Sequence, residues 1–484
     1  ERQLISNQAE GQHSFPFLNE SRLEWDYSES RARLETPDQR RYRFDPDPIS
    51  GFIFSRRSDS NVRRFSLLND RATDWGASGF VPFGFGWLDA ELSGGYRLLE
   101  KSRDSSIRRF EFDDISNLSE EQRRELSVEN ILTPENIGPG GVRLVDGTRA
   151  TDNYLASLDV EAWYTNLDLT LADRIRLSGG VRFEDWTQEV ETFELFNPDA
   201  PPVLSTLGAN DVFPAASLTW YITDRQQLRA SYAETIIRPD FKELSPAPFT
   251  DPILNREVIG NAELVPSDVQ HLDLRWEFYP GPDELLSIGA FYKLIDRPIE
   301  LTVQPGVEQR LSFANAEEAE NFGIEFEGRK TLGFIGRWID REALLQRFYV
   351  AGNFSIIESE ITIAEADRGI LTSTSRALQG QSPLIINAQL GYDDPNLGLE
   401  ATVLYNFVGE RISEVGVLGA PDKFEQGIGE LDFVLRWRWK DRIGFSAKFG
   451  NLLDSEFEIL QGGELTQGFS TGRTVSLGVD FDLL

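Results

Sequence analysis

Apolar and polar residues alternate at every second position in segments spread over the whole chain, and this alternation limits what the chain can fold into. In HLDLRWEFYP (271–280), leucine and aromatic side chains fall on one side of an extended strand and mostly charged side chains fall on the other. Because successive side chains of a β-strand point to opposite faces, the pattern predicts strands with one apolar and one polar face. Further segments with this pattern are LLSIGAFYK (285–293), LDFVLRWRWK (431–440), IGFSAKFG (443–450) and TVSLGVDFDL (474–483).

The links between these strands distinguish a soluble sandwich or β-helix, which also alternate, from a membrane barrel. Tight links are expected at 173–174, 223–225, 280–283, 394–396 and 440–442, and long links at 196–211, 238–267, 304–317, 409–429 and 460–472. Tight turns on one rim and long loops on the other are typical of outer-membrane barrels, whose turns are periplasmic and whose loops are extracellular. We therefore predict an all-β fold, a large antiparallel transmembrane β-barrel over residues 1–484, with roughly 16 to 18 strands recognisable by alternation.

The hydrocarbon of a membrane explains why one face of each strand is so apolar. In lipid every backbone N–H and C=O must be paired within the protein, so a sheet spans a membrane only if it closes. No run of 18 apolar residues occurs, which excludes an α-helical span. The aromatic residues expected at the membrane interfaces, near strand ends, are Tyr221, Trp276, Trp437 and Trp439.

Composition excludes several classes of function. The chain carries 48 Lys and Arg against 80 Asp and Glu, a net charge of -32, so phosphate repulsion argues against a nucleic-acid partner. Cysteine is absent, which excludes disulfides and thiolate metal sites. With only His13 and His271, a histidine-based metal site is not expected either.

Catalysis has little support in the sequence. The acid pairs Glu358/Glu360 and Asp480/Asp482 each share one face of a strand and are formal acid/base candidates. We interpret them as lumen-facing charges that are solvated or paired across the strand. The glycine-rich stretch 138–141 lacks the Lys-Ser/Thr of a phosphate-binding loop, and two histidines build no convincing Ser-His-acid set. We predict no enzymatic activity and no catalytic residue.

Two acidic stretches, 110–121 and 189–200, fall in or beside predicted extracellular loops. Carboxylate oxygens suit calcium, although such clusters are more often simply solvated and neither stretch has the spacing of a calcium-binding loop. Calcium in these loops therefore stays an alternative, and no metal-binding residue or cofactor is predicted.

Two stretches depart from the strand pattern. Residues 119–132 predict a short amphipathic helix in an extracellular loop, with Ser119 as N-cap and with Arg123 and Arg124 exposed. Residues 334–346 predict a longer turn, partly helical, on the rim that carries the tight turns.

Several segments, in a fixed order over most of the chain, resemble the barrel of TonB-dependent outer-membrane receptors. They include IIRPDFKELSP (236–246), FANAEEAENFGIEFEGRK (313–330), YNFVGERISEVG (405–416), FGNLLDSEFE (449–458) and GRTVSLGVDF (472–481), together with 260–301 and 378–394. Each segment alone is a weak signal, and their common order makes the resemblance specific.

This resemblance implies a barrel of about 22 strands around an N-terminal plug, in the outer membrane of a Gram-negative bacterium. It further implies uptake of a scarce ligand, such as a siderophore, cobalamin or an oligosaccharide, energised by the TonB complex. Neither a plug nor a TonB box is found in the sequence, so we expect residues 1–484 to be the C-terminal part of such a receptor. The expected partners are outer-membrane lipid and the TonB complex through a further N-terminal segment. Whether the barrel works alone or with a surface lipoprotein stays open. A passive diffusion channel and a scaffold or anchor for another surface complex are the alternative functions.

Ligand contacts in such a receptor are expected from lumen and loop residues. Arg238 and Phe241 at a strand-to-loop junction, with Phe249 beyond, combine a forked donor with aromatic surface, which suits a carboxylate-bearing or sugar-like ligand. The alternative is that these residues anchor the long loop to the wall. The residues expected to line the lumen are Asp273, Arg275, Glu277, Lys293 and Arg436.

Overall fold

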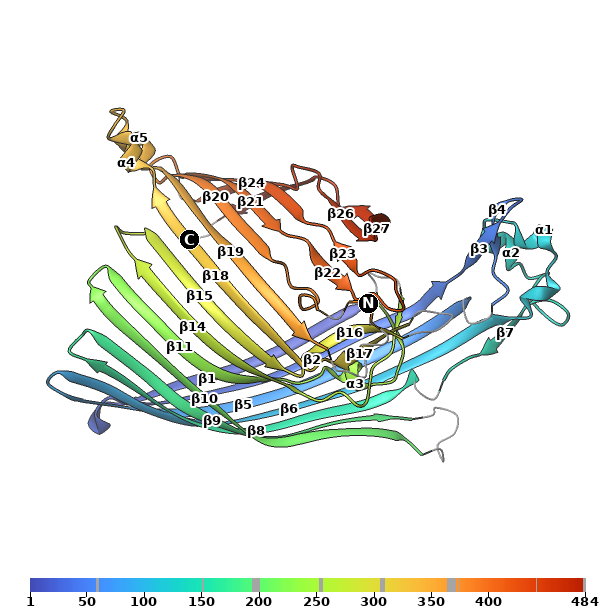
Figure 1. Cartoon of the computed structure of the whole chain (residues 1–484), viewed down its shortest axis with the longest axis horizontal. Helices are drawn as coiled ribbons and strands as arrows, with labels where there is room; N and C mark the ends of the chain where they lie inside the picture. Colours follow the sequence, from blue (N-terminus) through green and yellow to red (C-terminus); the bar gives the residue numbers. More distant parts are fainter. Residues whose placement is uncertain are drawn as a thin grey trace.

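One large antiparallel sheet dominates the computed structural model and curves into a wall (Figure 1). Among the described residues, no helix is both long and apolar enough to cross a membrane. The structure describes residues 1–57, 61–149, 152–193, 201–251, 256–304, 310–363, 371–373, 375–440 and 442–481.

The sheet has 18 strands, and each except the short β7 (Arg143–Asp146), which pairs only with the end of β6, belongs to a simple up-and-down meander. Each of the remaining 17 except the last, β28, pairs antiparallel with the next one along the chain. The predicted fold and the strand count are thus confirmed. These strands are β1 (Arg2–Phe15), β2 (Ser21–Arg41), β5 (Val62–Phe85), β6 (Leu88–Asp113), β8 (Tyr154–Leu171), β9 (Ile175–Thr192), β10 (Val203–Thr223), β11 (Gln226–Ile237), β14 (Ser267–Phe278), β15 (Leu285–Asp296), β18 (Glu318–Thr331), β19 (Phe348–Thr362), β20 (Leu384–Asp394), β21 (Leu399–Val408), β24 (Ile428–Trp439), β25 (Ile443–Gly450) and β28 (Thr474–Phe481).

Tight turns and long loops separate onto opposite rims, as predicted. Ala172 and Asp173 both have positive φ (46° and 55°) between β8 and β9, the geometry that matches the twist of a two-strand hairpin. Between β20 and β21, Gly398 has a φ of 61°, and a Cβ there would lie 2.4 Å from the carbonyl oxygen of Arg438. Only glycine fits that turn without strain.

Two predicted loops are shorter than expected. The strand β10 begins at Val203, so the predicted loop over 196–211 is wrong from that residue onward, and 194–200 lie outside the described residues. Val203 pairs with Thr192, because β9 and β10 continue their ladder beyond the last residues that β10 pairs with β11. The predicted loop 304–317 contains a strand, β17 (Arg310–Asn315), which forms a hairpin with β16 (Ile299–Gln304).

The long loops fold into small sheets of their own at the extracellular rim. Buried apolar clusters lie where these loops pack on the inner wall, for example Phe241 and Leu244 against Tyr154 and Val190. The small sheets are β12 (Phe249–Asp251), β13 (Arg256–Val258), β17 and β16; β22 (Arg411–Glu414), β23 (Lys423–Glu425), β26 (Glu456–Gln461) and β27 (Glu464–Ser470); and β3 (Phe44–Asp47) with β4 (Gly51–Phe54).

The predicted helix at 119–132 is present as two short helices, α1 (Glu120–Arg123) and α2 (Val128–Ile131). Ser119 is the N-cap of α1, as predicted, in a reciprocal capping box with Gln122. The predicted exposure of Arg123 is wrong, because its guanidinium is 5% exposed and donates to the carbonyl oxygen of Phe54 from Nε (3.0 Å) and from Nη2 (2.7 Å).

Arg124 is also not free, since it donates to Asp47 at 3.1 Å and to Glu120 at 2.9 Å. A third short helix, α3 (Phe241–Leu244), follows β11 on the inner side of the wall. The helical turn predicted at 334–346 is present as α4 (Gly333–Gly336) and α5 (Glu342–Leu345), at the tip of β18 and β19 (Figure 1).

The two faces of the wall differ as the alternation predicted. Large apolar side chains lie exposed on the outer face, among them Leu272 (54%) and Leu274 (49%) of the segment first quoted. On the same face, the ring of Tyr96 lies 5.8 Å from that of Trp75 and 5.3 Å from that of Trp163. Such outward aromatic groups suit the interface between hydrocarbon and headgroups.

Candidate functional site

The five residues predicted to line the lumen lie on the inner face of the wall. Asp273, Arg275 and Glu277 alternate with the exposed leucines of β14. Arg275 donates to Glu277 at 2.9 Å and to Glu327 at 2.5 Å, so this part of the inner face is an ion-paired ladder.

The other two lumen candidates are held less tightly. The Lys293 Nζ lies 5.3 Å from the ring centroid of Phe291, a cation–π contact on the inner face of β15. Arg436 alternates with the outward Trp437 and comes within 3.8 Å of Glu400, with 69% of its side chain exposed.

One acid pair is not where the sequence suggested. Glu358 and Glu360 share a face of β19 with Ile356, which is 52% exposed on the outer side. Their interpretation as lumen-facing charges is therefore wrong. The strand extends beyond the apolar band, so its outer face carries charge there. Asp480 lies on the inner face of β28, and Asp482 lies outside the described residues.

Arg238 follows directly on β11 and contacts the wall. Its Nη2 donates to Glu184 at 2.5 Å, and its guanidinium lies 4.5 Å from the ring centroid of Trp186. Glu184 also accepts from Arg182 at 2.6 Å. The guanidinium thus holds the start of the long loop against β9, which is the anchoring geometry considered as the alternative for this residue.

Phe241 and Phe249 occupy different places. Phe241 is 2% exposed, and Lys101 and Arg103 lie over its ring at 5.1 and 5.3 Å, so it presents no surface to a ligand in this conformation. Phe249 is partly buried in β12, with the Lys242 Nζ at 5.5 Å from its ring centroid. The structure therefore brings neither ring to Arg238 as one binding surface.

A buried cluster of charges, here called the arginine cluster, lies at the extracellular mouth instead. Its centre is Glu257 on β13, which four guanidinium groups approach. The Glu257 carboxylate lies 3.0 Å from Arg64, 3.4 Å from Arg109, 3.2 Å from Arg310 and 4.0 Å from Arg149. The cluster joins two wall strands to three loops.

A second carboxylate, Asp152, completes the cluster. Arg109 donates to it at 2.9 Å, and both side chains are almost fully buried, with 1% and 0% exposed. Among the described residues, four guanidinium groups thus face two carboxylates in a chain whose net charge is -32. The buried Nε of Arg109 has no hydrogen-bond partner among the described residues.

The cluster sets the ionisation of its central acid. Burial would raise the pKa of Glu257, but the four arginines outweigh it and hold that pKa below its ordinary value of 4.5. Glu257 is therefore ionised at neutral pH and serves as the counter-ion of the cluster.

The neighbouring residue on β13 points to a different loop. Arg256 forms an ion pair with Glu414 of β22, and Glu414 also lies 2.9 Å from the Lys423 Nζ. Because successive side chains of a strand point to opposite faces, β13 connects the wall on one side to the β22–β23 hairpin on the other. Buried Val258, Leu311 and Val417 pack beside these charges.

Sequence reasoning missed the arginine cluster, although one signal pointed to it. VRRF (62–65) and IRRF (107–110) place an arginine pair at the ends of two neighbouring strands. In the ladder Arg64 lies directly opposite Arg109, and like charges in that position repel each other unless an anion lies between them. The acid that fills this place, Glu257, comes from a loop far along the chain.

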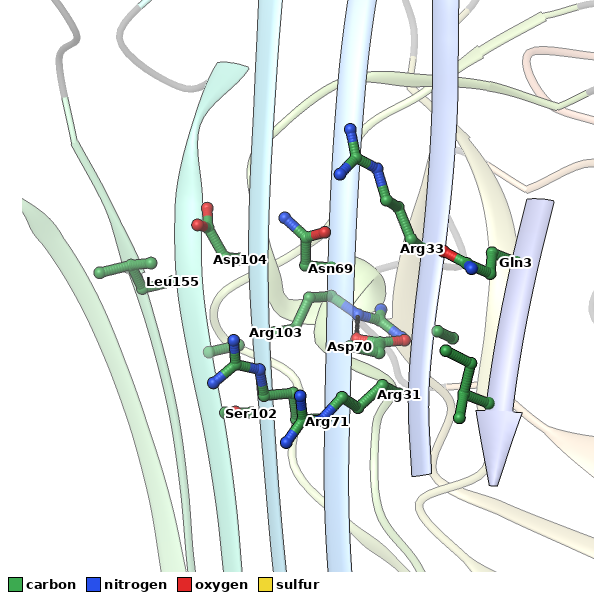
Figure 2. A pocket seen from close by; sticks show the side chains of 13 residues that line it. Gln3, Arg31, Arg33, Asn69, Asp70, Arg71, Ser102, Arg103, Asp104 and Leu155 are labelled. Carbon is green, nitrogen blue, oxygen red and sulfur yellow. Dashed lines mark hydrogen bonds and ion pairs between the residues drawn. The ribbon is translucent and has the colours of Figure 1, made fainter. Parts of the chain in front are cut away.

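A separate charged cavity of about 600 Å³ lies against the wall strands β1, β2, β5, β6 and β8 (Figure 2). Arg103 and Asp70, paired at 2.6 Å, belong to the inner face, because Arg103 also reaches Asp240 beside α3 at 3.1 Å. The other polar lining residues alternate with this pair and face the outer side of the wall: Gln3, Arg31, Arg33, Asn69, Arg71, Ser102 and Asp104.

No group of three or more His, Asp or Glu side chains is placed to hold a metal ion in the described part of the chain. Of the two acidic stretches considered for calcium, 110–121 is described, and residues 194–200 of the other lie outside the described ranges.

Comparison with known proteins gives one family. The family model described as TonB dependent receptor-like, beta-barrel, matches residues 5–452. No curated protein sequence matches the chain significantly.

Solved structures share the fold at low sequence identity. The ferric-catecholate import receptor Fiu of E. coli matches with a TM-score of 0.66 and 14% identity, over 99% of this chain and 64% of that one. The copper transporter OprC matches with a TM-score of 0.63 and 15% identity, over 99% and 65%. The siderophore receptor PiuA of Acinetobacter baumannii gives 0.63 and 12%, over 99% and 64%. The chain thus spans about two thirds or less of these proteins' length.

The antiparallel meander, the apolar outer face and the family match over nearly the whole chain agree with one another. The family consists of transporters rather than enzymes and resides in the outer membrane of Gram-negative bacteria. This chain therefore belongs to the TonB-dependent receptors, as their β-barrel.

Proposed function

We propose that the receptor to which this barrel belongs imports a scarce anionic ligand, of the metal-chelate class that includes ferric siderophores, in a step energised by TonB. The observation that carries this proposal is the pair of partly exposed guanidinium groups, Arg149 and Arg310, at the edge of the arginine cluster at the mouth. Guanidinium groups bind carboxylate and similar oxyanions through paired, charge-assisted hydrogen bonds.

The edge of the cluster is open to a ligand. Arg149 and Arg310 remain 33% and 34% exposed, whereas Arg64 and Arg109 are buried beneath them. An anion arriving from outside would meet these two guanidinium groups first. The names of three matched structures, a ferric-catecholate import receptor, a siderophore receptor and a ferric citrate transporter, support the same class of ligand.

The direction of the end strands supports the proposal that further strands complete the barrel. The 17 meander strands are all antiparallel to their neighbours, so β1 and β28 run in the same direction. Two such strands cannot close an antiparallel barrel on each other, and closure needs an odd number of additional strands. A TonB box in the same further segment would receive the energising pull.

The proposal is tested with the full-length receptor and the ferric complex of a triscatecholate as probe, followed by tryptophan fluorescence. The double variant R149Q/R310Q is expected to raise Kd at least about tenfold, because each lost charge-assisted hydrogen bond costs about 1.5–3 kcal/mol. A matched control is R108Q, on the opposite face of β6 from Arg109 and 53% exposed, which should leave Kd unchanged. Equal Kd values for the double variant and wild type would contradict an anion site at the cluster.

The passive-channel alternative gives a different result in planar bilayers. A plugged receptor is expected to conduct little current, whereas large, steady ohmic steps from the full-length protein would favour the channel.

A further inference from the structure

The turn between β18 and β19, residues 332–347, differs from the other turns on the same rim. It contains the two helices α4 and α5 and projects beyond the strand ends (Figure 1). We call it the helical turn. The other links on this rim are short: 16–20, 86–87, 172–174, 224–225, 279–284, 395–398 and 440–442.

The helical turn holds its large apolar side chains out rather than packing them together. Trp338 is 83% exposed, Ile339 59%, Leu344 47%, Phe334 42% and Ile335 37%. A patch of this kind on a protein surface normally contacts a membrane or another molecule.

Its backbone is nevertheless compact. A Cβ at Gly336 would lie 2.6 Å from Cα of Glu342, so α4 packs directly on the start of α5. A Cβ at Gly333 would lie 2.6 Å from Cγ of Gln346. The two glycines allow the close approach that fixes the apolar side chains outward.

The turn is joined to the lipid-facing side of the wall. Lys330 lies on the outer face of β18, the same face as the exposed Phe326 four residues before it. Its partner on β19 is Val350, which is exposed on that face too. The Lys330 Nζ lies 5.8 Å from the ring centroid of Phe334. The apolar patch therefore continues the surface that meets hydrocarbon, instead of the inner wall.

The helical turn and the strand ends beside it hold more basic than acidic residues, unlike the chain as a whole. Residues 329–347 carry five basic groups and two acidic ones, and two of the basic groups, Lys330 and Arg347, are paired with Glu284 and Asp394 outside this segment. Arg337 pairs with Glu342 at 2.9 Å, and Arg341 has no ion-pair partner among the described residues. A basic amphipathic segment with a tryptophan on its apolar side is typical of binding to a membrane surface with anionic lipids.

We propose that the helical turn is an interfacial anchor, which inserts Trp338 and Ile339 into the periplasmic leaflet of the outer membrane. Arg337 and Arg341 then lie at the anionic headgroups of that leaflet. The anchor fixes the height and tilt of the barrel on its periplasmic side. This proposal rests on the location of the barrel in the outer membrane and does not depend on which ligand the receptor imports.

The test uses the absence of cysteine from this chain, which permits a single spin label. In the full-length receptor, freed of any cysteine elsewhere, I339C carries a nitroxide and Trp338 is retained. D173C, in the exposed β8–β9 turn, is the matched control. Both are placed in nanodiscs of phosphatidylethanolamine with and without phosphatidylglycerol, and collisions with oxygen and with a water-soluble nickel chelate are measured.

The expected result is a ratio of oxygen to nickel collisions several-fold higher at position 339 than at position 173. The added substitutions R337E/R341E should lower that ratio most in the discs with phosphatidylglycerol. Equal ratios at the two positions would overturn the proposal. A label at 339 shielded from both reagents would overturn it too, because protein contact, such as a second copy of the chain, produces that result.

Folding is checked independently of the label. Heat-modified migration in gel electrophoresis reports a folded barrel for each variant, and L344C places a second label on the same patch. If a folded receptor labelled at L344C collides with the nickel chelate as often as one labelled at D173C, the proposal of an interfacial anchor is rejected.

Discussion

The membrane-spanning wall and the extracellular mouth of this barrel use opposite arrangements of apolar and charged residues. In the wall, Trp163 and Leu167 of β8 are exposed by 46% and 37%, and the inner face carries the charge. At the mouth, Arg109 and Asp152 are buried, with 1% and 0% of their surface exposed, beneath loops that pack apolar residues inward. The lipid contacts one region, and the chain itself covers the other.

This difference shows where each region obtains its stability. The wall depends on strand pairing and on lipid for its apolar face. The mouth depends on loops that meet through a charge cluster, in which Arg64 and Arg109 are held side by side by Glu257. Removing one charge should therefore loosen the mouth and leave the wall intact.

The largest effect is expected from E257A. It leaves buried arginines without their counter-ion, and breaking a buried pair by removing one partner costs about 3–5 kcal/mol. Hydrogen exchange should report faster exchange in β13 and β17, with little change in β14 and β15. The exposed E121A, in α1, is the control. Unchanged protection of β13 would contradict the role of the cluster.

Lowering the pH should loosen the mouth loops in the same way as E257A, but to a smaller extent. The folded pKa of Glu257 lies below the ordinary 4.5, so its stabilising contribution is complete above that pH and is lost as the pH falls through the lower, folded value. Proteolysis of the mouth loops by an acid-active protease should accelerate below about pH 4.5, relative to E257Q measured at each pH. A parallel pH dependence in E257Q would assign the effect to other groups.

The smallest effect is expected in the wall lumen. R436Q removes a 69% exposed side chain that lies 3.8 Å from Glu400, and exposed pairs contribute about 0–1 kcal/mol. The midpoint of urea unfolding in detergent should therefore shift little, and salt should reduce even that shift. A loss above about 2 kcal/mol would mean that the lumen depends on its ion pairs as strongly as the mouth does.

The wall could be predicted from the sequence because its information is local. Period-two alternation and tight turns predict both ends of β25 (Ile443–Gly450) and the first residues of β15 and β28, Leu285 and Thr474. Those features are set by neighbours in the chain and by the membrane.

The mouth could not be predicted in the same way. Arg64 and Glu257 meet across almost half of the chain, and nothing in the alternation of either segment indicates the contact. The sequence around Arg123 predicts an exposed side chain, because it contains no sign that β4 packs beside this helix. The charge of Glu358 predicts a place in the lumen, but charge marks the inner face only where the outer face meets hydrocarbon, and β19 extends further.

The strand β13 has a mechanical consequence for the loops. Its two adjacent side chains, Glu257 and Arg256, are tied to the wall and to the β22–β23 hairpin respectively. Moving this short strand away would break both ion pairs at once, so the attachment of its loop to the wall and its attachment to the β22–β23 hairpin are coupled. We therefore expect the β13 loop and the β22–β23 hairpin to move together rather than one after the other.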